Sequence, residues 1–65
     1  MNENSPVLID ERNGLGRIVL NRPKALNSLT LEMVDLIAPR LAAWAGDPAI
    51  YAVLIEGVGD RAFCA

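Results

Sequence analysis

The chain has 65 residues, of which 52% are hydrophobic and 22% charged, and its formal net charge at pH 7 is −2. This apolar share is too high for a disordered tail, and the charge balance indicates neither a nucleic-acid surface nor a polybasic membrane-binding stretch. With no histidine and only one cysteine, Cys64, the chain can form no internal disulfide and no ordinary zinc site. We therefore expect at most one small domain without a metal, in a reducing, cytoplasmic setting.

The first 21 residues predict a polar, flexible start followed by a hairpin. Residues 1–6 are polar and lack the basic-then-apolar order of a signal peptide. Two aliphatic runs follow, and Asn13-Gly14 lies between them. Because both residues of an Asn-Gly pair accept positive φ, the pattern predicts an antiparallel β-hairpin with strands over about 6–11 and 16–21.

A helix is predicted after a connecting loop over residues 24–29. Thr30 is a suitable N-cap, and Gly46 with Asp47-Pro48 ends the helix. One apolar face is expected from residues at helical spacing, namely Met33, Ile37, Leu41 and Trp44. Pro39 lies inside the helix and should kink it or open it locally.

The last element expected is a buried strand over residues 51–55, which is apolar without alternation. The helix before it acts as a crossover, so this strand should run parallel to the second hairpin strand. A glycine-flanked loop, Gly57-Val58-Gly59, follows the strand. Such loops at the carboxyl ends of strands are where open α/β folds place ligands.

Individually, the chemically active side chains give weak signals. The carboxylates Asp10, Glu11, Asp35 and Asp47 are scattered, as expected of solvated charges. Cys64 has no histidine to act as its base, so we interpret it as a small packing residue rather than a nucleophile.

Two segments are informative together: Asn21-Arg22-Pro23-Lys24-Ala25-Leu26-Asn27-Ser28-Leu29 and Gly59-Asp60-Arg61-Ala62-Phe63-Cys64-Ala65. Their order around a helix and an apolar strand resembles the N-terminal part of the crotonase, or enoyl-CoA hydratase/isomerase, family, over nearly the whole chain. Softer features, the mid-helix Pro39 and Trp44 among them, are most similar to its 3-hydroxyisobutyryl-CoA hydrolase branch. The resemblance implies a crotonase-like α/β fold, of which residues 1–65 form the N-terminal fragment: a hairpin, one kinked helix and a buried parallel strand that ends at the oxyanion-hole loop.

The resemblance also implies roles for particular residues. The backbone N–H of Ala65 matches one donor of an oxyanion hole, and the small side chains of Ala62, Cys64 and Ala65 let an acyl-CoA approach the main chain. Lys24, Ala25 and Leu26 match the segment that contacts the adenine and 3′-phosphate end of CoA. For Lys24, an exposed loop lysine is an equally good interpretation. Asn21, Arg22 and Asn27 are interpreted as residues that fix the loop.

For a longer parent protein, the resemblance implies an enzyme that hydrolyses 3-hydroxyisobutyryl-CoA in valine breakdown, with no cofactor besides the CoA of its substrate. The fragment alone is expected to be inactive. Enoyl-CoA hydration or isomerisation is the alternative chemistry, and a weak CoA-binding module or a non-enzymatic remnant is the alternative class. No nucleic-acid or membrane partner is expected. Because many members of the family are trimers or hexamers, the parent is expected to be a homo-oligomer.

Overall fold

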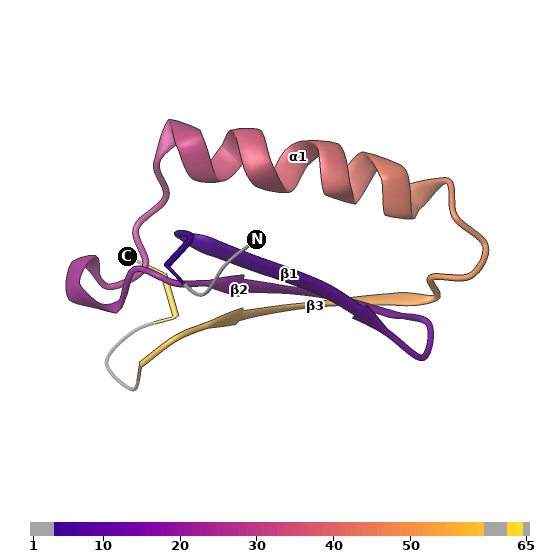
Figure 1. Ribbon diagram of the computed structural model, residues 1–65, viewed down its shortest axis with the longest axis horizontal. Helices are drawn as coiled ribbons and strands as arrows, with labels where there is room; N and C mark the ends of the chain where they lie inside the picture. Colours follow the sequence, from indigo (N-terminus) through magenta and orange to yellow (C-terminus); the bar gives the residue numbers. More distant parts are fainter. Residues whose placement is uncertain (1–3, 60–62, 65) are drawn as a thin grey trace.

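The computed structural model describes residues 4–59, 63 and 64. A three-stranded sheet of order β1-β2-β3 carries one helix, α1, along one of its faces (Figure 1). In chain order, the elements are β1 (Val7–Arg12), β2 (Leu15–Leu20), the 3₁₀ helix η1 (Pro23–Ala25), α1 (Leu31–Ala45) and β3 (Ala52–Gly57). The expected α/β arrangement of hairpin, helix and strand is confirmed.

The hairpin forms at the predicted place. β1 and β2 pair antiparallel, with Arg12 opposite Leu15, so each strand is within one residue of the expected bounds. Asn13 and Gly14 have φ of 53° and 83°, as a two-residue turn with two positive φ angles requires. Before β1, the carbonyl of Pro6 accepts a hydrogen bond from the Asn21 N–H at 2.8 Å. The predicted flexibility of residues 1–6 stays a prediction, and residues 1–3 lie outside the described part.

Helix α1 begins and ends where the sequence indicates. The Thr30 hydroxyl oxygen accepts a hydrogen bond from the Met33 N–H at 3.2 Å, which confirms the N-cap. The helix stops at Gly46, but this glycine has φ of −98°, so the chain does not use its freedom to adopt a left-handed conformation.

Pro39 neither ends nor opens α1, which runs unbroken through it. The expected local opening of the helix was therefore wrong, and the expected kink stays a prediction. Asp35, whose carbonyl loses its helical partner at Pro39, is exposed, as is Pro39 itself. Water can therefore reach that side of the helix and hydrogen-bond the carbonyl, so the helix can continue through Pro39.

The buried face of α1 is narrower than predicted. Met33 and Trp44 are buried, whereas Leu41 is 37% exposed. Leu36, which was not predicted to face the core, packs against it together with Ile37. The core cluster lies between α1 and the hairpin and consists of Val7, Ile18, Leu20, Met33 and Trp44.

β3 pairs parallel with β2, as expected, but it is not a buried strand. It lies at the edge of the sheet, and Val53, Leu54 and Ile55 are each 42–43% exposed. The prediction of burial was wrong because apolar composition alone does not supply neighbours. In the described part of the chain, β3 has a strand on one side only, and α1 lies over only one face of the sheet (Figure 1).

Ion pairs join the three strands away from the core. Arg17 in β2 contacts Asp10 in β1 at 3.0 Å and Glu56 in β3 at 2.8 Å. The hydrogen bond to Glu56, and then that to Asp10, raise the pKa of the Arg17 guanidinium. Asp10 and Arg17 lie opposite each other in the hairpin, seven residues apart, whereas Glu56 is 39 residues from Arg17 and its contact was not predicted.

Candidate functional site

The residues between β2 and α1 fold back on themselves as a compact loop, which we call the proline loop (residues 22–28). The Arg22 carbonyl accepts hydrogen bonds from the N–H groups of Ala25, at 3.0 Å, and Asn27, at 2.8 Å. Leu26 and Asn27 both have positive φ, of 54° and 59°. These two left-handed residues reverse the chain after η1, so the loop returns toward β2 instead of extending into solvent.

Asn27 is the centre of this loop. It is fully buried, with 0% of its surface exposed. Its Oδ1 accepts a hydrogen bond from the Arg22 N–H at 2.8 Å, and its Nδ2 donates one to the Val58 carbonyl at 2.9 Å. The loop-fixing interpretation of Asn27 is confirmed. The bond to Val58, 31 residues away, was not predicted.

The partner of Asn27 belongs to the strand-end segment, by which we mean residues 57–59, 63 and 64. The Val58 N–H donates to the Leu20 carbonyl at 2.9 Å, which continues the β2–β3 pairing. A Cβ on Gly57 would collide with the Phe63 carbonyl and would lie 2.7 Å from the Asn27 Nδ2. Gly59 has φ of 97° and lies against the Pro23 ring. The two sequence motifs therefore meet in space, and only glycine fits at their closest approach.

Cys64 lies at the far end of the strand-end segment. It is the one cysteine of the chain, is half-buried and packs against the core cluster. The chain has no histidine to deprotonate it. Its contact with the core agrees with its interpretation as a packing residue, whereas its predicted place beside the acyl-CoA stays a prediction.

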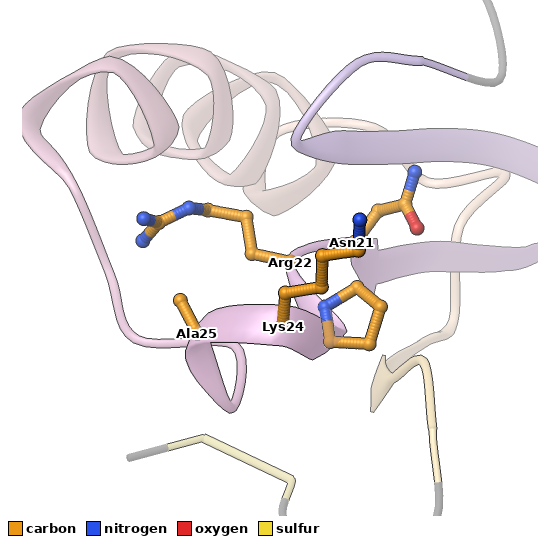
Figure 2. Close-up of a pocket in the computed structure, with 5 residues that line it drawn as sticks. Asn21, Arg22, Lys24 and Ala25 are labelled. Carbon is orange, nitrogen blue, oxygen red and sulfur yellow. The ribbon is translucent and has the colours of Figure 1, made fainter.

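A hollow of about 390 Å³ opens beside the proline loop, lined by residues 21–25 (Figure 2). Lys24 and Ala25, two of the three residues predicted to contact CoA, line it; Leu26 follows at the end of η1 and is half-buried. The Arg22 and Lys24 side chains point in different directions (Figure 2). The Arg22 guanidinium donates to the Ser28 carbonyl and hydroxyl, so it acts within the loop. Lys24 is exposed, so its ammonium group can meet an anion from solvent.

Some of the predicted site residues lie outside the part of the chain that the structure describes. These are Ala62 and Ala65, including the backbone N–H of Ala65, so their roles stay predictions. Among residues 4–59, 63 and 64, no group of three or more histidine, cysteine, aspartate or glutamate side chains is placed to hold a metal ion. No helix in these ranges has the length and apolarity needed to cross a membrane.

Comparison with known proteins decides the family. A model of the enoyl-CoA hydratase/isomerase family matches residues 15–65, which include both motifs. The chain belongs to the enoyl-CoA hydratase/isomerase family. The solved structure of a carnitinyl-CoA dehydratase from Mycobacterium thermoresistibile aligns with a TM-score of 0.90 and 52% identity, over 95% of this chain and 18% of that one. The predicted crotonase-like fold is thereby confirmed for this N-terminal portion.

Among curated members of the family, the chain is similar to mitochondrial 3-hydroxyisobutyryl-CoA hydrolases. It is 60% identical to that of Xenopus tropicalis over 50 residues, which are 77% of this chain and 13% of the relative. It is 46% identical to that of Gallus gallus over 59 residues, 91% of this chain and 15% of the relative. The chain thus spans about 15% of the length of these relatives.

Proposed function

We propose that this chain is the CoA-binding N-terminal part of an acyl-CoA thioester hydrolase that acts on 3-hydroxyisobutyryl-CoA, a step of valine breakdown. The observation that carries the proposal is the meeting of the proline loop and the strand-end segment through Asn27 and Val58. One segment carries the predicted CoA contacts and the other leads to the predicted oxyanion donor, so a single ligand could reach both.

In this proposal the hollow beside the proline loop receives the nucleotide end of CoA. The Lys24 ammonium is a compact charge suited to a phosphate group. Ala25 and Leu26 would hold the adenine through main-chain hydrogen bonds and packing. The hollow of about 390 Å³ is within the range of small-molecule sites.

The chemistry would take place beyond the strand-end segment. Attack of water on the thioester carbonyl places negative charge on its oxygen, and backbone N–H groups about 2.7–3.1 Å away stabilise that charge. We assign one of these donors to Ala65. Small side chains at Ala62, Cys64 and Ala65 would leave room for the acyl group near the main chain. The products are the free carboxylic acid and the CoA thiol.

Similarity to curated 3-hydroxyisobutyryl-CoA hydrolases, at 46% identity over 91% of this chain and 60% over 77%, supports hydrolysis. The alternative is hydration or isomerisation of enoyl-CoA. A dehydratase at 52% identity keeps the alternative open to test. The third candidate is a CoA-binding module or a remnant without activity. It would have the same hollow beside the proline loop but would catalyse neither reaction.

We propose that the whole protein needs no cofactor beyond the CoA of its substrate and that it is a homo-oligomer. It is expected to bind neither nucleic acid nor a membrane. A cytoplasmic location stays a prediction, and the curated hydrolases above carry "mitochondrial" in their names.

The test uses the gene product that contains this chain, produced in full. Incubated with 3-hydroxyisobutyryl-CoA, it is expected to release free thiol, measured with a thiol reagent. With crotonyl-CoA, it should leave the absorbance of the enoyl thioester unchanged. Loss of that absorbance without thiol release would favour the hydratase alternative. CoA binding without either reaction would favour the binding module.

A further inference from the structure

Asn27 has an unusual combination of burial and bonding for a loop residue. Its side chain is fully buried between two segments that lie about thirty residues apart in the sequence, and both ends of its amide are used. Buried amides with both ends bonded fix the relative position of the groups they join, because breaking either bond leaves a buried polar atom without a partner.

We propose that Asn27 is a positioning residue that couples the nucleotide end of the acyl-CoA site to its reacting end. The inference rests on the proposed function, and it names a residue through which binding energy at one end of the substrate supports the reaction at the other. Asn27 belongs to the proline loop and its side chain is fully buried, so its action on the substrate passes through Arg22 and Val58.

Two hydrogen bonds of one side chain connect the two ends of the site. The Oδ1 of Asn27 holds the N–H of Arg22, the first residue of the proline loop, two positions before Lys24. Its Nδ2 holds the carbonyl of Val58, at the start of the segment that leads to the predicted donor. A ligand that orders the proline loop therefore also orders the amide, which in turn restricts Val58.

This arrangement matters for catalysis, because binding energy from a remote part of a substrate raises kcat only if it is transmitted to the reacting centre. Misplacement of a catalytic group by about 1 Å can cost about 10²-fold in rate. Without the Asn27 amide, the nucleotide can still bind, but its ordering of the proline loop is no longer transmitted to Val58. The effect should therefore fall on kcat with the full substrate.

The left-handed backbone of Asn27, with φ of 59°, sets the choice of variants. Asn27→Gly keeps that conformation without strain and removes the side-chain bonds to Arg22 and Val58. Asn27→Asp keeps an acceptor for the Arg22 N–H but places an oxygen where Nδ2 donates to Val58. The matched control is Asn13→Gly, at an exposed left-handed position in the hairpin turn.

The experiment measures kcat and KM of the full gene product with 3-hydroxyisobutyryl-CoA and with the corresponding pantetheine thioester, which lacks the nucleotide. In the unsubstituted protein, the nucleotide should raise kcat. In Asn27→Gly, kcat with the CoA substrate is expected to fall about tenfold or more, while kcat with the pantetheine substrate changes less than about threefold. Asn27→Asp should behave in the same way, and Asn13→Gly should match the unsubstituted protein.

A thermal melt shows which of the Asn27 variants is folded. If kcat of a folded variant falls by the same factor with both substrates, the coupling is overturned and Asn27 is a purely structural residue. In that case the proposed hydrolase function would stand. An unsubstituted protein that releases no thiol from either substrate would instead overturn the proposed function, and this inference with it.

Discussion

The two ends of β2 are held by different kinds of interaction. At the hairpin end, the Trp44 ring packs on Gly16, and its Nε1 donates to Glu11 at 2.9 Å. At the site end, the contacts are mainly polar and centre on Asn27. Each end has an asparagine with positive φ, but Asn13 is exposed in a turn and Asn27 is fully buried. The same local conformation thus serves a turn in one place and a long-range connection in the other.

The largest effect on stability is expected at the hairpin end. Trp44→Ala removes a ring that is 96% buried against the sheet, and such truncations cost about 3–5 kcal/mol. Trp44→Phe keeps most of the packing but loses the bond to Glu11, so it should cost about 1 kcal/mol. Urea denaturation of both variants measures the difference. Equal losses would mean that the hydrogen bond, not the packing, holds this end.

The second effect contrasts the two asparagines directly. Asn27→Gly leaves Arg22 and Val58 without their side-chain partner and should lower the free energy of unfolding by about 2 kcal/mol. Asn13→Gly removes an exposed side chain and should change it by less than about 0.5 kcal/mol. Matched urea titrations compare the two. If the free energy of unfolding falls by a similar small amount in both variants, the hydrogen bonds of Asn27 do not hold the site end together.

Substrate binding should depend on the site end through Lys24. Lys24→Gln removes the charge proposed to meet a CoA phosphate, so KM for the acyl-CoA is expected to rise about tenfold, equivalent to about 1.4 kcal/mol, with kcat nearly unchanged. KM for the pantetheine thioester should not move. A control, Lys24→Arg, keeps the charge. If Lys24→Gln leaves KM for the CoA substrate unchanged, Lys24 is a solvated loop residue.

A smaller effect on stability is expected at the hairpin turn. Gly14 has φ of 83°, which costs an alanine about 1 kcal/mol. The added Cβ would also meet the Tyr51 ring, which is 78% exposed and can move aside, and would lie 3.1 Å from the Ala49 carbonyl oxygen, which would have to shift by a few tenths of an ångström. Thermal unfolding of Gly14→Ala should therefore show a modest drop in Tm with unaltered kcat. A change in kcat would link the hairpin turn to the site.

The smallest effect is expected from Arg17, whose ion pairs are partly exposed and screened by salt. Replacing it with glutamine should lower Tm slightly at low salt and less at high salt. Because folding raises the pKa of Arg17, its contribution is present below its unfolded-state pKa and is lost only at strongly alkaline pH. A loss of this contribution between neutral and mildly alkaline pH would contradict that sign.

Local sequence rules predicted most of the fold. The Asn13-Gly14 turn and the Thr30 cap depend on neighbouring residues only, and both formed as expected. Pro39 shows the limit of such rules, because the cost of a missing hydrogen bond depends on whether the carbonyl faces water. The prediction that β3 is buried was wrong for a related reason. The exposure of a strand depends on the elements that pack against it, and the strand's own composition does not specify them.

The candidate site was predicted in part. The motifs identified the proline loop and the residues near Lys24, and the structure places Lys24 and Ala25 at one hollow. The contact between Asn27 and Val58 could not be found from spacing, because it joins residues from two separate loops. The glycines at 57 and 59 were visible as a loop signal, but their close approach to Phe63 and Pro23 appeared only in three dimensions.

The most direct test of the account is amide hydrogen exchange on the full gene product, with and without CoA. The account predicts slower exchange in peptides that cover residues 21–29 and 57–65, and unchanged exchange in the hairpin turn at residues 10–16. Protection of the turn, or protection of residues 21–29 without residues 57–65, would contradict the claim that the two segments form one acyl-CoA site.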